Sequence, residues 1–251
     1  MKIILSPAKK MNICNDYISP SSSPVFLNES KNLLEYLRKM SYEELKALWK
    51  CNDSIAALNY ERILSMDLEK NVSPALLSYE GIQYQYMAPN VFTDKQWEYA
   101  KKHVRILSGF YGVLKPLDGV VPYRLEMQSK ISFGQYKSLY AFWGDKIYKE
   151  LRKETSLLLN LASKEYGKCV EEFWEESVPL LHCHFGEKIQ GTIKVKGTMA
   201  KMARGEMVRF LSEEGIEDKE GIPYFHRLGY TFSKEESTKN VYVFLKEAKG
   251  K

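Results

Sequence analysis

Two glycines separated by two residues, Gly109 and Gly112, end a segment that has helical periodicity. Glycine lets the backbone turn sharply and present its amide groups, and such amides can hold a phosphate. Ser108 precedes the turn and Lys115 follows it. The segment therefore predicts a phosphate-binding turn, although a helix C-cap followed by a tight turn without any ligand would use the same residues.

A second polar group lies in the segment Pro122–Met127. If this segment is a strand, alternation places Arg124 and Glu126 on one face and the apolar side chains on the other. An arginine can hold a phosphate or carboxylate through two parallel hydrogen bonds, and a neighbouring glutamate could orient it or act as an acid or base. The pair suits a polar pocket, but it equally suits a structural ion pair on a partly exposed strand.

Further polar side chains stand at the predicted ends of helices and strands. Asp145 begins a helix after two aromatic residues, where it could simply interact with the helix N-terminus. Asn160 lies just beyond a buried strand, where open α/β sheets tend to place ligand contacts. The candidate catalytic residues are then Arg124, Glu126 and Asp145, and the candidate phosphate-binding residues are Lys9, Lys10, Ser108, Gly109, Gly112, Lys115, Arg124, Lys201 and Arg204.

The triplet His182-Cys-His184 raises the question of a metal, because alternate residues of a strand point the same way. No second cluster of ligating residues occurs at a standard spacing, however. The chain also contains no phosphate-binding glycine motif, nucleophile elbow or zinc-protease helix. The sequence therefore predicts neither a metal site nor a cofactor.

Charge is sorted into blocks along the 251 residues, which carry a formal net charge of +5. Residues 95–137 contain eight Lys or Arg and only three Asp or Glu, and residues 182–210 contain six against two. Such sorting can produce a basic face suited to a polyanion. The alternative is that these charges lie on solvated helix faces and scatter in three dimensions.

The N-terminal apolar run stops at Leu5, which is shorter than a secretion signal needs, and no stretch has the ~20 apolar residues that span a bilayer. The four cysteines form no Cys-x-x-Cys pair and are too sparse for a disulfide framework. We therefore expect a cytoplasmic protein that has no contact with a membrane, with cysteines that are buried thiols.

The periodicity of apolar residues predicts alternating helices and strands. The mixture indicates an α/β (mixed α+β) fold in which residues 1–251 form a single compact domain around a central mixed sheet. Helices are predicted over residues 28–40, from Ser41, from Asn52, over 93–107, over 139–152 with an interruption at Gly144, and over 197–211; strands are predicted over 2–5, 156–161, 180–185, 190–195, 224–232 and 241–245.

Several short motifs occur together in a fixed order across nearly the whole chain. They are Leu5-Ser-Pro-Ala-Lys9, Leu107-Ser-Gly-Phe-Tyr-Gly-Val-Leu-Lys-Pro-Leu-Asp118, Tyr123-Arg-Leu-Glu-Met127, Phe142-Trp-Gly-Asp145, Asn160-Leu-Ala-Ser163 and Ala203-Arg-Gly205. In combination they resemble the YaaA family of bacterial peroxide stress proteins.

The resemblance implies protection from hydrogen peroxide and a link to limiting free intracellular iron. It also implies binding of duplex and branched DNA, with little sequence preference, through a basic cleft and a helix-hairpin-helix-like element within an unusual fold. Carried onto this sequence, that hairpin falls on Ser108–Leu114, with Lys115 beside it. Lys9, Arg124, Lys201 and Arg204 become candidate cleft residues by charge and location.

Two hypotheses follow. The first is a DNA-binding protein of the oxidative stress response. The second is an enzyme that acts on a phosphorylated or nucleotide-like small molecule, in which five polar side chains converge in one deep pocket. These five are Lys9, Arg124, Glu126, Asp145 and Asn160.

Overall fold

A mixed sheet of eight strands runs through the protein, which we describe from a computed structural model over residues 1–14 and 18–246. The strand order is β11-β12-β9-β8-β1-β5-β6, and β10 pairs with β9. The neighbours from β12 to β5 are parallel, whereas β6, β10 and β11 pair antiparallel. The strands are β1 Lys2–Leu5, β5 Val104–Ser108, β6 Gly112–Leu114, β8 Leu158–Asn160, β9 Leu180–Ile189, β10 Thr192–Lys194, β11 Tyr230–Ser233 and β12 Val241–Lys246.

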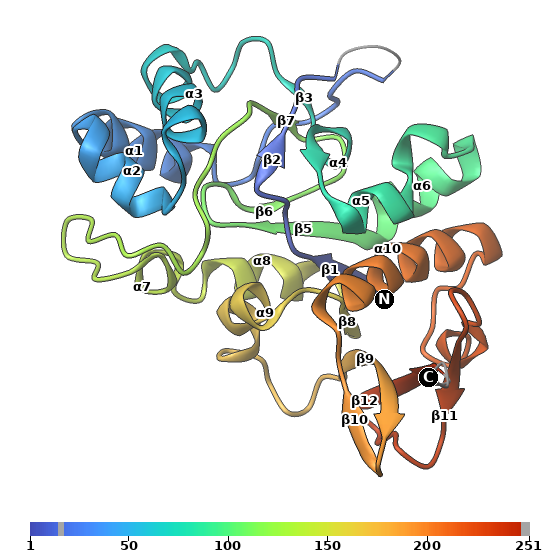
Figure 1. Cartoon of the computed structure of the whole chain (residues 1–251). Coiled ribbons are helices and arrows are strands. Elements are labelled where there is room, and N and C mark those ends of the chain that lie inside the picture. Colours follow the sequence, from blue (N-terminus) through green and yellow to red (C-terminus); the bar gives the residue numbers. More distant parts are fainter. Residues whose placement is uncertain (15–17, 247–251) are drawn as a thin grey trace.

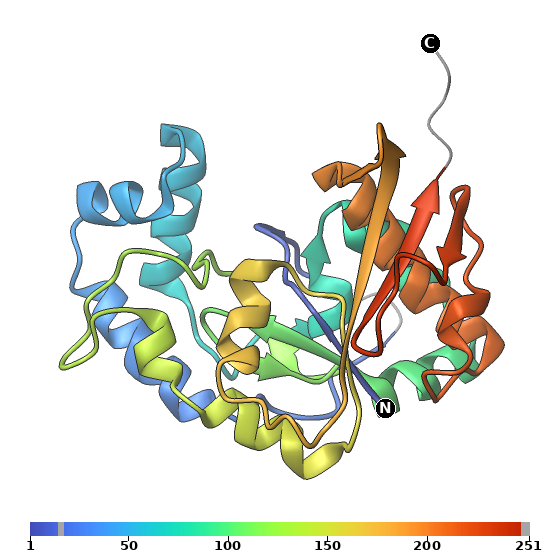
Figure 2. The same cartoon turned by 90° about the horizontal axis from the view of Figure 1, so that it is seen from below.

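Helices cover both faces of this sheet, with α8 and α9 on one side and α6 and α10 on the other (Figure 1). Helices α1 to α3 form a separate group near β6, at the opposite end of the molecule from β11 and β12 (Figure 2). The helices are α1 Leu27–Arg38, α2 Tyr42–Trp49, α3 Asp53–Ser65, α4 Ala75–Ser78, α5 Ile82–Met87, α6 Asp94–His103, α7 Leu139–Trp143, α8 Lys146–Glu154, α9 Lys164–Glu171 and α10 Gly197–Glu214.

Two short strand pairs lie outside the eight-stranded sheet. Strand β2 (Lys10–Met11) pairs with β4 (Tyr79–Glu80), and β3 (Ser73–Pro74) pairs with β7 (Gly119–Val120). Because one core cluster includes apolar side chains from β1, from α1 to α3 and from β12, the described chain forms a single compact α/β domain. The predicted fold class is confirmed.

Several predicted boundaries agree with side-chain caps. Ser41 and Glu44 form a capping box at α2, Thr93 and Gln96 form another at α6, and Asn52 caps α3. Gly144 separates α7 from α8 with a positive φ of 47°. These caps satisfy backbone amides that the first turn of a helix leaves free, which is why the local sequence marks these starts well.

The segment around Gly109 is where the prediction was wrong. Helix α6 ends at His103, and Val104–Ser108 is a fully buried strand rather than more helix. Strand β6 then returns antiparallel beside β5, with Ser108 opposite Gly112. Residues Ser108–Leu114 therefore form a β-hairpin, not a helix-hairpin-helix-like element.

Two other predicted strands have different boundaries. Strands were predicted over 180–185 and 190–195, but β9 continues to Ile189, and the turn to β10 comes at Gln190-Gly191, where both residues have positive φ. The predicted strand 224–232 begins only at Tyr230, because Ile222–Tyr224 forms a 3₁₀ turn. None of the residues from Pro122 to Met127 belongs to a strand, and Met127 begins a turn.

Candidate functional site

A cavity of about 490 Å³ opens at the carboxyl ends of β1 and β8. In the sheet, β5 lies beside one edge of β1, and β8, which comes later in the chain, lies beside the opposite edge. Strand order therefore reverses between β1 and β8, and open α/β sheets bind ligands at the crevice that such a reversal creates. Loops after these two strands, together with α5, α10 and the segment that contains Arg124, line the cavity.

Hydrogen bonds hold the two strand ends together beneath the cavity. The Ser163 amide donates to Ser6 Oγ at 2.8 Å, and the Tyr84 hydroxyl donates to the Ser6 carbonyl at 2.9 Å. Ser6 directly follows β1, whereas Ser163 is the N-cap residue of α9. The floor of the cavity is thus positioned by backbone and hydroxyl groups.

Helix α10 supplies two cations that lie one turn apart, Lys201 and Arg204. The helix can come close because Gly205 packs directly against the Gln83 carbonyl of α5, where no Cβ atom would fit. Burial lowers the pKa of Arg204, although an arginine remains charged at neutral pH. Neither cation forms a hydrogen bond or ion pair with another described residue, and the Arg204 Nε atom is buried without a hydrogen-bond partner among them.

Arg124 and Glu126 form the facing wall. The predicted alternation holds although no strand forms, since Tyr123, Leu125 and Met127 are buried and the two charged side chains turn to the cavity. The Arg124 Nη2 atom lies 3.3 Å from Glu126 Oε1, and the two side chains are only 11% and 12% exposed. Lys9 Nζ reaches the same Oε1 atom at 3.3 Å.

Glu165 adds a second carboxylate to this side of the cavity. Its Oε1 atom accepts a hydrogen bond from the backbone amide of Gln128 at 3.2 Å. Burial raises the pKa of Glu165, and the nearby charge of Glu126 raises it further. Glu165 therefore takes up a proton more readily than an exposed glutamate does.

The cavity is basic and carries unused hydrogen-bonding capacity. Five cations line it, opposed by three carboxylates, Glu80, Glu126 and Glu165. Buried Nε atoms of both Arg124 and Arg204 lack a hydrogen-bond partner among the described residues. A buried donor without a partner costs free energy, so these two groups are suited to an anionic ligand that supplies acceptors.

The glycine turn is not part of this cavity. Ser108, Gly109 and Gly112 are buried, and Ser108 Oγ accepts hydrogen bonds from the amides of Phe110 and Tyr111 at 3.1 and 2.8 Å. A methyl group at Gly112 would lie 2.8 Å from Phe26 and Trp143 atoms. The turn was predicted to hold a phosphate through its amides, but these amides are buried and donate to Ser108 instead.

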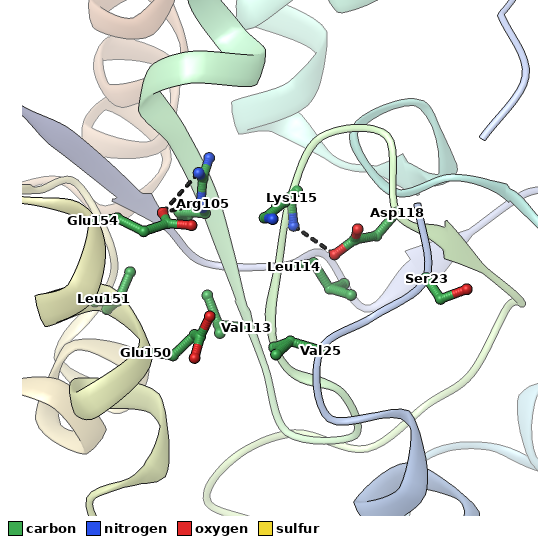
Figure 3. A pocket seen from close by; sticks show the side chains of 10 residues that line it. All are labelled: Ser23, Val25, Arg105, Val113, Leu114, Lys115, Asp118, Glu150, Leu151 and Glu154. Atoms are coloured by element: carbon green, nitrogen blue, oxygen red, sulfur yellow. Dashed lines mark hydrogen bonds and ion pairs between the residues drawn. The ribbon is translucent and has the colours of Figure 1, made fainter. Parts of the chain in front are cut away.

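Lys115 lies by a separate small cavity of about 30 Å³ (Figure 3). Its backbone amide donates to Asp118 Oδ2 at 2.8 Å. On the opposite wall, Arg105 Nε donates to Glu154 Oε2 at 2.7 Å (Figure 3). A cavity of this volume holds about one water molecule, so it is too small to be a ligand site. The pairing of Arg105 with Glu154 beside it is therefore structural.

Replacing Glu154 with alanine should lower the free energy of unfolding by about 3 kcal/mol, because Arg105 is 5% exposed and would be left as an unpaired buried charge. Glu150 lines the same small cavity, but among the described residues its ion pair is with Lys153 on its own helix, so Glu150→Ala should change stability by less than about 0.5 kcal/mol. Urea denaturation of both variants checks this. Equal losses in the two would contradict the assignment.

Two further predicted site residues lie elsewhere. Asp145 pairs with Lys149 at 2.7 Å on its own helix and does not line the large cavity. Asn160 is buried, with Nδ2 donating to Glu171 Oε1 at 2.6 Å and Oδ1 accepting from the Ala162 amide at 2.8 Å. Both side chains serve local structure. The structure therefore brings together Lys9, Lys10, Arg124, Glu126, Lys201 and Arg204 of the predicted site residues.

Sequence reasoning missed Glu165, Ser6 and Tyr84 as lining residues. Glu165 belongs to an acidic block whose pattern is typical of a solvated helix face, so the neighbouring sequence gives no sign that it lines a cavity. Ser6 had a usable signal, because it comes directly after the first buried strand. The end of β8 does line the cavity, through Ser163 and not through Asn160.

None of the helices in the described residues is both apolar enough and long enough to span a membrane. All four cysteines are free, and burial raises the pKa of Cys169 to about 12. Within residues 1–14 and 18–246, no group of three or more His, Cys, Asp or Glu side chains is arranged to hold a metal ion.

Comparison with known proteins places the chain among its relatives. Residues 1–236 match a family model described as peroxide stress protein YaaA. A UPF0246 protein of Desulfitobacterium hafniense is 52% identical over 246 residues, which is 98% of both chains. A UPF0246 protein of Agathobacter rectalis is 50% identical over 97% of this chain and 98% of its own. Since the match covers nearly the whole chain and supports a role in oxidative stress, the chain belongs to the YaaA family of peroxide stress proteins.

Proposed function

We propose that this protein binds DNA during the oxidative stress response, with little sequence preference, through the basic cavity and its rim. The observation that carries the proposal is that five cations from separate segments meet at one cavity, and that two of them have a guanidinium nitrogen with no hydrogen-bond partner in the described part of the chain. Phosphate oxygens are the acceptors that arginine and lysine most readily satisfy. Side chains that contact phosphates carry no sequence information directly, so duplex and branched DNA should both bind.

The glycine turn plays no part in this proposal. Contact instead falls to exposed Lys9, Lys10 and Lys201 at the rim, with Arg124 and Arg204 further in. Each phosphate that is neutralised releases counterions from DNA, and the logarithm of the affinity then falls with the logarithm of the salt concentration with a slope of about −0.9 per phosphate. Engagement of the rim should give a slope of about −3 to −4.

Fluorescence anisotropy of labelled duplex, across a range of salt concentrations, tests this. We expect binding at low salt that weakens steeply as salt rises, and a smaller slope in Lys9→Ala and Lys201→Ala variants. Lys115→Ala is the matched control, because Lys115 is exposed and lies outside the cavity. The proposal fails if no duplex binds at low salt, or if Lys115→Ala weakens binding as much as the rim variants.

Replacing Glu165 with glutamine should tighten DNA binding at neutral pH by roughly 3- to 10-fold, since a partly screened like charge costs on the order of 1 kcal/mol. The raised pKa of Glu165 sets the pH dependence. Wild-type affinity should be highest at acidic pH, where Glu165 is protonated, and should fall as pH rises through the raised pKa. The other cavity carboxylates, Glu80 and Glu126, are present in both proteins, so the comparison isolates the contribution of Glu165.

Anisotropy titrations of wild type and Glu165→Gln between pH 5 and 8, at constant ionic strength, measure the difference. The two affinities should converge at the acidic end and separate toward neutral pH. If they separate instead toward acidic pH, Glu165 does not oppose the bound phosphate.

An enzyme acting on a phosphorylated small molecule is the second candidate function. It draws support from the convergence of Arg124 and Glu126, which are largely buried, with the exposed Lys9, whose Nζ atom reaches Glu126. Asp145 and Asn160 stand outside that wall, however, so the predicted set of five is incomplete. Turnover of nucleotide substrates that is lost in Glu126→Gln would support this function.

A further inference from the structure

The cations of the cavity differ in how deep they lie. Lys9 and Lys10 each keep 68% of their side chains exposed, so a phosphate on the outside of a duplex can reach them. Arg124 is only 11% exposed, and the unpartnered Nε atoms of Arg124 and Arg204 are buried. A duplex that lies across the rim therefore meets the two lysines first, and only a phosphate that enters the cavity reaches the inner nitrogens.

We infer that the cavity receives one nucleotide unit, whose phosphate is held by Arg124 and Arg204 and whose sugar and base enter the enclosed space. This deepens the proposed DNA-binding function and rests on it for one of the two possible sources of the nucleotide. The unit comes either from a free nucleotide or from a DNA strand that extrudes one nucleotide into the protein.

The size of the cavity agrees with this ligand. Its volume of about 490 Å³ lies within the range of about 300–1,000 Å³ that is typical of small-molecule sites. A whole duplex segment does not fit such a space, whereas one nucleotide does. The position at the reversal of strand order is also where α/β sheets bind nucleotides.

The lining has the chemistry that a nucleotide requires beyond its phosphate. Tyr84, Tyr123 and Tyr166 are largely buried and supply the edges of aromatic rings to the lining, which suits the apolar surface of a base. Burial raises the pKa of Tyr123 to about 12, so its hydroxyl stays neutral. Glu126 and Glu165 accept hydrogen bonds, which suits sugar hydroxyls and the amino groups of bases.

The anchoring of these walls makes the cavity a preformed site. The Tyr123 hydroxyl lies 2.9 Å from the Tyr79 hydroxyl and 2.6 Å from Ser108 Oγ, which joins it to the buried β-hairpin. The Tyr84 hydroxyl is fixed to the end of β1. Ser108 therefore supports the site from behind, even though it contacts no ligand.

Two measurements test the inference. The first is calorimetric titration with deoxyadenosine 5′-monophosphate, compared with deoxyadenosine and with inorganic phosphate. We expect the nucleotide to bind more tightly than either part, and Arg204→Met to weaken it at least tenfold. Arg124→Lys provides a second variant that retains the charge but loses the fork of donors. Lys115→Met, outside the cavity, should bind as wild type does.

The second measurement uses duplex DNA that carries one 2-aminopurine, whose fluorescence rises when the base leaves the stack. A rise on binding that is reversed by deoxyadenosine monophosphate identifies DNA as the source of the nucleotide. Nucleotide binding without any rise identifies the free nucleotide as the source. Both results support the inference.

The failures are distinguishable. If DNA binds by anisotropy but the nucleotide does not bind and no fluorescence rise occurs, the inference is overturned and the DNA-binding function stands. If the nucleotide binds through Arg204 but no DNA binds, the DNA-binding function fails and the cavity remains a nucleotide site. Nucleotide binding that Arg204→Met and Arg124→Lys leave unchanged, in variants with wild-type near-UV circular dichroism, also overturns the inference.

Discussion

Replacing Arg204 with methionine will stabilise the protein and at the same time weaken DNA binding about tenfold or more. The guanidinium of Arg204 is largely buried, has no partner among the described residues and has a pKa lowered by burial. Methionine keeps the length of the side chain without a charge to desolvate. We expect a gain of about 1 kcal/mol in the free energy of unfolding, at the low end of gains for replacing buried charges by apolar groups.

The loss of binding has a separate cause. Hydrogen bonds to a charged group contribute about 1.5–3 kcal/mol, and 1.4 kcal/mol corresponds to a factor of ten in affinity. Thermal unfolding and anisotropy on the same preparation measure both effects. Arg209→Met is the matched control on the same helix, because Arg209 already pairs with Glu213 at 2.8 Å and lies outside the cavity. A destabilised Arg204→Met variant would mean that Arg204 serves the fold.

Replacing Gly109 with alanine will destabilise the fold by about 3 kcal/mol, near the upper end of the cost of overpacking. A methyl group at Gly109 would lie 2.5 Å from the Leu125 carbonyl oxygen and 3.0 Å from the Glu126 carbonyl carbon. Both neighbours are backbone atoms, so no side chain can turn away to make room. The clash would also push on the segment that positions Arg124 and Glu126.

Gly197→Ala is the control for this substitution. Gly197 begins α10, and a methyl group there meets no atom within 4 Å. Alanine also has the higher helix propensity, so stability should be unchanged or slightly higher. Urea denaturation compares the two variants. If Gly109→Ala had wild-type stability but bound DNA more weakly, the glycine turn would bind phosphate after all, and its assignment as a buried structural β-hairpin would be wrong.

The error at Gly109 has a clear physical origin. Trp97, Ala100, Val104 and Leu107 recur at helical spacing, but every position of Val104–Ser108 is buried. A strand that is buried on both faces can carry apolar residues at any spacing, so over a short stretch it can imitate helical periodicity. The β-branched residues Val104 and Ile106 favour the strand. Only the tertiary pairing of β5 with β1 decides between the two.

The predictions for the site were more accurate where local chemistry determines position. Alternation placed Arg124 and Glu126 together correctly, even though Pro122–Met127 forms no strand. Burial alternates along the segment, because Tyr123, Leu125 and Met127 are buried while the two charged residues between them are only partly buried. Lys9 was found from its place after the first strand. Asp145 and Asn160 were predicted to reach the same pocket, but they do not, because Asp145 pairs with Lys149 and Asn160 donates to Glu171 instead.

The contribution of α10 to the cavity wall could not be derived from its sequence alone. Lys201 and Arg204 reach the cavity because Gly205 lets α10 lie directly against α5, and these two helices are more than a hundred residues apart in the chain. A basic stripe on a helix looks the same whether it faces solvent or a ligand. The packing of one glycine against one carbonyl decides which it is.

Arginine side-chain NMR tests the central claim most directly, because the Nε–H groups of the cavity arginines should bind phosphate. Arg124 and Arg204 have Nε atoms without partners, whereas Arg105 Nε already donates to Glu154. With ¹⁵N-labelled protein, and signals assigned through arginine variants, titration with duplex DNA should shift the signals of Arg124 and Arg204 and leave that of Arg105 in place. If DNA binds while both cavity signals stay unchanged, the cavity is not where phosphate is held.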